Sequence, residues 1–212
     1  CRFGNYFEEI KFTFFQFLFL KNKYSSMKKI TKTLLITATS LLTFQSCDSQ
    51  KVVVNREVET TNDGKMLLGT QTKNQFQKTP YSDWYVKEHD EYAIDQKTVD
   101  ELKKEKLNYY GITDEMGTWC EDSHREVPRL MKILESMNFP EQKLTIIAVN
   151  HKKEAPNGEE GVYNIQRVPT IIVQKYGKEI GRIIEYPTTG YLERDLLEIL
   201  KKDNTNLKDL FK

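Results

Sequence analysis

The segment GTWCEDSHREVP, residues 117–128, contains the side chains best suited to chemistry. Cys120 follows Trp119, and Ser123 stands where a dithiol Cys-x-x-Cys site has its second sulfur. A thiolate attacks a disulfide to form a mixed disulfide, which a second thiol then resolves. Ser123 cannot resolve it, although its hydroxyl can donate a hydrogen bond to a thiolate one turn back. The segment therefore predicts a monothiol site in which Cys120 forms mixed disulfides that an external thiol must release.

Helices and strands alternate from residue 95 onward and must position this segment. The hydrophobic pattern predicts an α/β sandwich, with a central mixed sheet flanked by helices. We expect helices over 95–106, 122–137 and 190–202, strands over 107–113 and 143–149, and a pair of strands over 170–186 that turns at Gly177.

Thr118 and Glu121 have the T-x-x-E spacing of a capping box, which would begin a helix at this point. Cys120 would then lie at a helix N-terminus, where unpaired N–H groups and the helix dipole favour a thiolate. The adjacent acids Glu121 and Asp122 oppose that effect by a similar amount, about 1 kcal/mol or less when exposed. The net effect on the Cys120 thiol stays open at this point.

The element order, with Trp119-Cys120 between a strand and its helix, resembles the thioredoxin family over residues 95–212. Further matching positions are Pro128, Tyr163, Ile165, Val168-Pro169-Thr170, Asp114 and Gly177. The resemblance is to a monothiol branch found in bacterial envelope lipoproteins. It implies a cis Val168–Pro169 bond, a peptide-binding role for Val168, Pro169 and Thr170, a site formed by Cys120, Ser123 and Trp119, and a buried Asp114 that accepts a proton.

Several positions depart from the family pattern. Ala148 stands where the family has a buried lysine beside its aspartate, and Glu185 replaces a glycine next to the peptide-binding surface. His124 lies one turn after Cys120 and is a candidate for tuning the thiol, or otherwise a solvated surface residue. His89 and His151 lack ligand spacing, so we expect no metal and no cofactor.

The N-terminal part of the sequence indicates export. Residues 27–46 combine a basic start at Met27 with a short apolar run, as in a signal peptide, and Cys47 follows as in a lipidated envelope protein. An ordinary secretory signal is the alternative. Residues 1–26, which hold seven of the phenylalanines, are interpreted as upstream sequence, with Met27 as the start. Residues 47–94 are expected to be the lipidated cysteine, a tether and a docked extension rich in aromatic residues.

Charge and composition limit the partners. Residues 48–212 contain 25 basic and 29 acidic side chains, so a nucleic-acid partner is not expected. We expect a lipoprotein of the bacterial envelope that faces the periplasm and is anchored to a membrane by lipid. Its partners would be client proteins with cysteines or disulfides, and a small-molecule or protein thiol that resolves the product. A binding or thiol-retention module without turnover remains the alternative.

Overall fold

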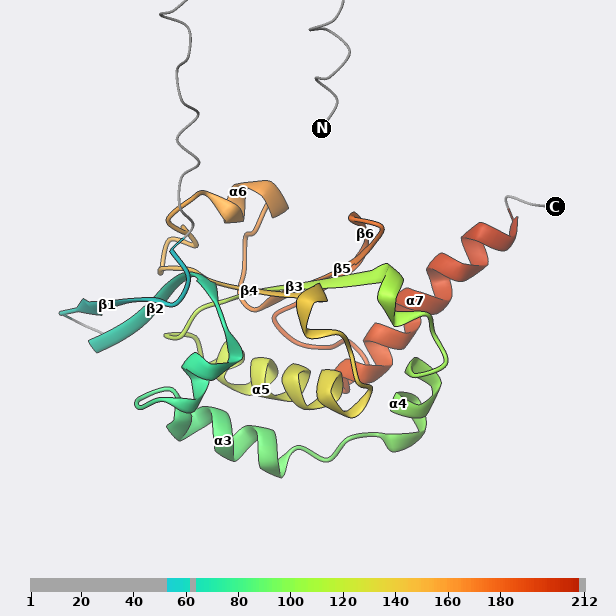
Figure 1. Ribbon diagram of the computed structural model, residues 1–212, viewed down its shortest axis with the longest axis horizontal. Coiled ribbons are helices and arrows are strands. Elements are labelled where there is room, and N and C mark those ends of the chain that lie inside the picture. Colours follow the sequence, from blue (N-terminus) through green and yellow to red (C-terminus); the bar gives the residue numbers. More distant parts are fainter. Residues whose placement is uncertain (1–52, 62–63, 210–212) are drawn as a thin grey trace, which may run out of the picture. The chain divides into compact units, whose positions relative to one another are not determined.

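A six-stranded mixed sheet forms the centre of the computed structural model, which describes residues 53–61 and 64–209 (Figure 1). The strand order is β1-β2-β4-β3-β5-β6, and only β3 and β4 run parallel. Adjacent strands β1–β2, β2–β4, β3–β5 and β5–β6 are antiparallel. The strands are β1 (Arg56–Thr60), β2 (Gly64–Gln71), β3 (Tyr110–Met116), β4 (Leu144–Ala148), β5 (Thr170–Lys175) and β6 (Lys178–Ile184).

Helices cover both faces of this sheet (Figure 1). α5 and α7 pack with the buried residues of one face, together with α3 and α4, whereas α6 lies on the other face. The α-helices are α3 (Ser82–Glu91), α4 (Gln96–Leu102), α5 (Glu121–Ser136), α6 (Glu159–Tyr163) and α7 (Leu192–Asp209). Short 3-10 turns are η2 (Lys73–Gln77), η3 (Leu107–Tyr109) and η4 (Glu141–Lys143). The α/β sandwich expected from the sequence is confirmed.

The central strand β3 places its residues alternately on the two faces. Ile112, Asp114 and Met116 point toward the α5 side, where Ile112 and Met116 join the larger apolar core. Glu115 has the opposite orientation and neighbours Ile147 and Thr170 on the adjacent strands. Because both faces are covered, even the polar residues of this strand are buried.

The helix α5 that follows the active segment is held by its apolar stripe. Val127, Leu130, Met131, Ile133 and Leu134 are all buried in the core. The spacing of these residues is that of one helical face. Pro128 lies inside the helix, and the helix continues through it to Ser136.

Four sequence-based boundaries were wrong, and so was the cap. The strand expected to end at residue 113 continues to Met116, and the helix expected to end at residue 202 continues to Asp209. The helix expected over 95–106 ends at Leu102, and the strand expected over 107–113 begins only at Tyr110, after a 3-10 turn. The N-cap of α5 is Cys120, with no side-chain capping bond, so Thr118 and Glu121 do not form a capping box. The Thr118 hydroxyl instead accepts a hydrogen bond from the Leu67 N–H of β2, at 3.2 Å.

The segment before β3 contributes to the same core as the sheet. β1 and β2 form a hairpin that pairs Thr60 with Gly64, where Gly64 has a φ of 66°. After β2, Phe76 of η2 stacks on Tyr85 of α3, with ring centroids 5.5 Å apart, and both rings are buried. Of the helices in the described residues, none is long and apolar enough to cross a membrane.

Candidate functional site

Cys120 lies at the turn between β3 and α5, just beyond the end of the central strand. Its backbone is extended, with φ −101° and ψ 122°, and its N–H donates to the Gly117 carbonyl at 3.0 Å. The thiol is partly buried and its Sγ lies 3.4 Å from the Val168 carbonyl oxygen, to which it donates. It is a free cysteine. The sulfur is thus held between the start of α5 and the loop before β5.

Ser123 lies behind this turn and is fully buried. Its Oγ accepts a hydrogen bond from the Gly117 N–H at 3.2 Å. The sequence suggested that this hydroxyl would donate to the Cys120 thiolate. The position that carries a second thiol in a dithiol site therefore stabilises the backbone of the turn here.

Trp119 lies over Gly117 on the other side of the cysteine. Its indole Nε1 donates to the Val149 carbonyl at 2.9 Å, and its ring stacks on His151 with centroids 4.2 Å apart. The Lys153 ammonium lies 5.9 Å from the centre of the same ring. One edge of the site is therefore aromatic and basic.

The loop before β5 brings Val168, Pro169 and Thr170 to the sulfur. The Val168–Pro169 peptide bond is cis, as the family resemblance implies. Val168 and Thr170 are buried, and the Thr170 hydroxyl donates to the Arg167 carbonyl at 2.7 Å. The loop thereby presents the Val168 carbonyl directly to Cys120.

Glu185 lies next to this loop and has a φ of 63°, which glycine adopts more readily than other residues. Its N–H donates to the Pro169 carbonyl at 2.7 Å, and its carboxylate forms an ion pair with Arg167 at 2.7 Å. Tyr186 follows and is 59% exposed. The Arg167–Glu185 pair therefore lies next to the cis-proline loop, and the sequence analysis singled out only Glu185 of this pair.

Asp114 is completely buried on the α5 side of β3. Neither of its carboxylate oxygens has a hydrogen-bond partner within the described part of the chain. Ala148, at the position of the family lysine, is also fully buried and offers no cation. Burial raises the pKa of the Asp114 carboxyl to about 7. Asp114 is therefore poised to gain or lose a proton near neutral pH, although no direct contact with Cys120 occurs.

Glu115 was missed by the sequence reasoning. It is also fully buried, on the opposite face, and its carboxylate oxygens likewise lack partners among the described residues. Burial raises its pKa to about 8, and the nearby Glu160 carboxylate adds to that effect. Two adjacent acids in a strand that is covered on both faces are the signal that would have identified it.

His124 does not face the thiol through its ring. The ring Nε2 lies 2.8 Å from the Thr118 carbonyl oxygen, and the ring stacks on Trp84 of α3 with centroids 4.4 Å apart. Among the described residues, no group of three or more His, Cys, Asp or Glu side chains could hold a metal ion. Cys47, the predicted lipidation site, lies outside the described residues.

The strand order and helix placement define the class of this protein. Strands β6-β5-β3-β4, with α5 and α7 on one face and α6 on the other, form a thioredoxin fold, and Cys120 follows its central strand. β2 joins the sheet antiparallel to β4 as part of the added β1–β2 hairpin. The chain thus has a thioredoxin fold, with a Cys-x-x-Ser segment between its central strand and the helix that follows.

Solved structures similar to this chain include several thioredoxins. A Pseudomonas aeruginosa protein of unknown function is 14% identical, covers 57% of this chain and 84% of its own, and has a TM-score of 0.47. A Fasciola hepatica thioredoxin is 18% identical, the match covers 49% of this chain and 89% of the thioredoxin, and the TM-score is 0.32. An oxidised mitochondrial thioredoxin from Saccharomyces cerevisiae is 20% identical, the match covers 44% of this chain and 81% of the thioredoxin, and the TM-score is 0.30. The fold assignment rests on the strand order and on the placement of the helices. No family model and no curated protein matches the chain.

Proposed function

We propose that this chain is a membrane-anchored monothiol thioredoxin-like protein of the bacterial envelope. In this proposal Cys120 forms mixed disulfides with client proteins, and an external thiol resolves them. The observation that carries the proposal is the placement of Cys120. Its sulfur is partly exposed at the N-cap of α5 and lies 3.4 Å from the Val168 carbonyl, next to the cis-proline loop.

The chemistry consists of two exchanges. The Cys120 thiolate attacks one sulfur of a client disulfide, the Cys120–client S–S bond forms, and the other client sulfur leaves as a thiolate. A second thiolate, from a small molecule or a partner protein, then attacks the client sulfur and returns Cys120 to its thiolate. The client disulfide is the oxidant in the first step, and the external thiol is consumed in the second.

Ser123 explains why the second step needs an external thiol. It is buried, its oxygen is occupied by the Gly117 N–H, and it has no sulfur to offer. Trp119 and the loop Val168–Thr170 would receive the client backbone on either side of Cys120. Arg167 would lie at the edge of that surface, where its side chain is exposed and paired with Glu185.

The test follows Cys120 in the full chain. The protein is incubated with glutathione disulfide, and the peptide that contains Cys120 is quantified by mass spectrometry with and without added glutathione. We expect a glutathione adduct on Cys120 that forms faster than on a free cysteine and disappears on addition of glutathione. Cys120→Ser is the control. A Cys120 peptide that reacts no faster than free cysteine would contradict thiol-exchange chemistry.

A binding or retention module is the second candidate, because the site lacks a second sulfur. In that case Cys120-dependent adducts with client proteins would form in the envelope and persist when glutathione is added. Release by glutathione with repeated turnover favours the enzyme. Comparing the lifetimes of wild-type adducts with and without glutathione therefore separates the two candidates, and Cys120→Ser shows that the adducts depend on Cys120.

We further propose that Asp114 exchanges a proton with the site during thiol exchange. The support is its complete burial, its raised pKa of about 7 and its position in the strand that ends at the cysteine turn. Asp114→Asn should change the pH dependence of adduct formation on Cys120. An unchanged pH profile would end that role while leaving the exchange chemistry intact.

Membrane anchoring through Cys47 is proposed from the sequence pattern alone, since that residue lies outside the described part of the chain. The test is fractionation of cells that express the full-length gene. Wild-type protein should sediment with membranes and incorporate a labelled fatty acid, whereas Cys47→Ala should do neither. Equal fractionation of both forms would exclude lipidation at this residue.

A further inference from the structure

The turn that carries Cys120 is fixed through Thr118, two residues earlier, from two directions. The Leu67 N–H of β2 donates to the Thr118 hydroxyl at 3.2 Å. The His124 ring of α5 approaches the Thr118 carbonyl oxygen at 2.8 Å. Since a carbonyl oxygen only accepts, the ring Nε2 must carry the proton and donate. Both the side chain and the backbone of Thr118 are therefore occupied.

His124 is held in that orientation by the N-terminal extension. Its ring stacks on the indole of Trp84, with centroids 4.4 Å apart and planes 12° from parallel. Trp84 belongs to α3, and it also contacts Phe76 and Tyr85 at centroid distances of 5.9 Å and 6.1 Å. The indole is thus a part of a packed aromatic cluster, which limits the freedom of the histidine.

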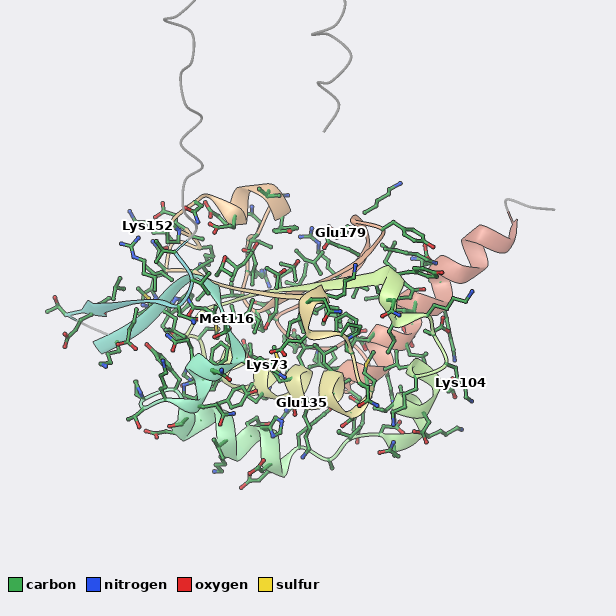
Figure 2. The ribbon with its side chains drawn as sticks, in the orientation of Figure 1. Lys73, Lys104, Met116, Glu135, Lys152 and Glu179 are labelled. Atoms are coloured by element: carbon green, nitrogen blue, oxygen red, sulfur yellow. The ribbon has the colours of Figure 1, made fainter. Side chains whose placement is uncertain are left out.

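The helix α3 is in turn attached to α5 by charged groups. Glu88 of α3 accepts from the Arg129 side chain at 2.6 Å, and Lys73 of η2 pairs with Glu135 at 3.0 Å. Figure 2 shows Lys73 and Glu135 lying close together between η2 and α5. The position of Trp84 relative to α5 is therefore defined by contacts on both sides of the aromatic cluster.

A shift at Thr118 is transmitted to the sulfur through a short hydrogen-bonded turn. The Cys120 N–H donates to the Gly117 carbonyl at 3.0 Å, and the Gly117 N–H donates to Ser123. The His124 backbone N–H donates to the Cys120 carbonyl at 3.0 Å. His124 consequently contacts the backbone on both sides of Cys120, through its ring before the cysteine and through its amide after it.

We propose that Trp84 and His124 are positioning residues for the Cys120 nucleophile, so that the N-terminal extension is a functional part of the site. This inference rests on the proposed thiol-exchange function. Trp84 orients the His124 ring, the ring fixes the Thr118 carbonyl, and Thr118 sets where the Cys120 sulfur lies relative to the start of α5 and the Val168 carbonyl. Neither residue takes part in the bond changes.

The test uses the full chain and three substitutions. His124→Leu removes the ring donor, Trp84→Leu removes the stacking surface, and His124→Gln retains an N–H donor near the place of Nε2. Val86→Ala is the matched control, because Val86 also lies on α3 but is 43% exposed.

Two measurements are made on each variant. The first is the initial rate of glutathione adduct formation on Cys120, followed by mass spectrometry of its peptide. The second is amide hydrogen exchange over residues 117–124, compared with exchange in β4, which reports whether the core is intact. If the two residues only stabilised the fold, their loss would speed amide hydrogen exchange in β4 as well as over residues 117–124. The rate of adduct formation on Cys120 in the folded protein would then stay unaltered.

We expect His124→Leu and Trp84→Leu to slow adduct formation roughly two- to fivefold, the range expected when a thiolate loses its alignment with a helix N-terminus. Exchange over 117–124 should become roughly two- to tenfold faster, as for loss of one hydrogen bond, with β4 unchanged. His124→Gln should recover most of the wild-type rate, and Val86→Ala should match wild type.

The outcomes separate this inference from the function on which it rests. If wild type reacts with glutathione disulfide faster than free cysteine but the two leucine variants react as fast or faster, positioning by Trp84 and His124 is wrong and thiol exchange stands. If both leucine variants also lose protection of the β4 amides from hydrogen exchange, His124→Gln is the deciding variant. A wild-type adduct rate in His124→Gln supports positioning through the ring donor, and a reduced rate in that variant overturns it. If wild type itself is no faster than free cysteine, the function fails first.

Discussion

Two adjacent carboxyl groups of β3 are the most unusual residues of this protein. Asp114 and Glu115 are fully buried on opposite faces of the central strand, and neither has a hydrogen-bond partner among the described residues. Burying an unpaired charge is costly, so such groups remain protonated to higher pH. Burial accordingly raises their pKa values to about 7 and about 8. Each neutral acid is compatible with the core, whereas each carboxylate is not.

The stability of the protein should therefore fall as pH rises toward neutrality. The pKa of Asp114 rises from 3.8 in the unfolded chain to about 7 in the folded one. Between these values the folded chain keeps a proton that the unfolded chain has lost, so the free energy of unfolding decreases by up to about 1.4 kcal/mol per pH unit. Asp114→Asn should remove that slope, measured by urea unfolding at a series of pH values.

Glu115→Gln provides the comparison for this experiment. Its contribution should extend over a window that reaches about pH 8, because burial raises its pKa further. The two substitutions should therefore remove parts of the slope that end at different pH values. A wild-type stability that rises steadily from acidic to neutral pH would show that these carboxyl groups are ionised and stabilised in the fold.

At Ser123, one atom separates a monothiol site from a dithiol site. Ser123→Cys would place a second thiol three residues after Cys120, and its attack on a Cys120 adduct would release the bound thiol and form an internal disulfide. We expect the glutathione adduct to decay without added thiol, roughly tenfold faster or more than in wild type. Adduct lifetime is measured by mass spectrometry of the Cys120 peptide.

Ser123→Ala is the control, because it also removes the acceptor of the Gly117 N–H but adds no thiol. Its adduct should last as long as that of wild type. If the adduct of Ser123→Cys persists equally, the buried position of Ser123 keeps a thiol there from reaching Cys120.

At the scale of elements, the β3–α5 turn depends on a close approach that only glycine permits. A Cβ on Gly117 would lie 2.6 Å from the Trp119 ring. The ring is fixed by its bond to the Val149 carbonyl and by stacking on His151, so it has little room to move. Met116, the last residue of β3, marks the end of the sheet from which this turn leaves (Figure 2).

Gly117→Ala should consequently displace the indole and weaken the turn. We expect a loss of about 1–3 kcal/mol in the free energy of unfolding, as for other overpacked sites. Urea unfolding measures this loss, and faster hydrogen exchange of the Trp119 indole N–H would report the broken bond to Val149. Gly161→Ala is the control, because a Cβ there meets nothing within 4 Å. Equal stability of both variants would mean that the ring adjusts freely.

At the scale of the whole molecule, the extension and the thioredoxin-like part share one apolar core. Phe76 and Tyr85 of the extension belong to the same cluster of buried residues as Leu130 of α5 and Leu196 of α7. Since these side chains are in mutual contact, the extension cannot unfold without exposing part of the α5 surface. The described residues 64–209 should therefore unfold cooperatively.

Phe76→Ala tests this cooperativity. Phe76 is fully buried, and removal of such a ring costs about 3–5 kcal/mol. We expect the entire urea transition to shift to lower denaturant while it remains single, when followed by circular dichroism and by tryptophan fluorescence. Val86→Ala, at a position that is 43% exposed, should shift it little. Two separate transitions would show that the extension unfolds independently.

Much of this arrangement was predictable from local pattern. The alternating elements predicted the sandwich and Gly177 predicted the β5–β6 turn, whereas the cis bond at Pro169 was implied only by the resemblance to the thioredoxin family. The boundaries at Leu102 and Tyr110 were missed because the intervening residues form a 3-10 turn with no distinct hydrophobic period. The capping box was predicted but is absent, because the Thr118 hydroxyl accepts from the Leu67 N–H of β2, which is distant in the sequence.

The sequence by itself therefore determined the order of elements and singled out Cys120 as the candidate nucleophile, since hydrophobic period and residue chemistry are local properties. Tertiary structure alone decided that Ser123 supports the turn, that Asp114 and Glu115 are both buried without partners, and that Trp84 holds His124 against Thr118. These features depend on contacts between residues far apart in the chain. Which residues meet in these contacts depends on the packing of the whole fold, and the local spacing of residues in the sequence does not predict it.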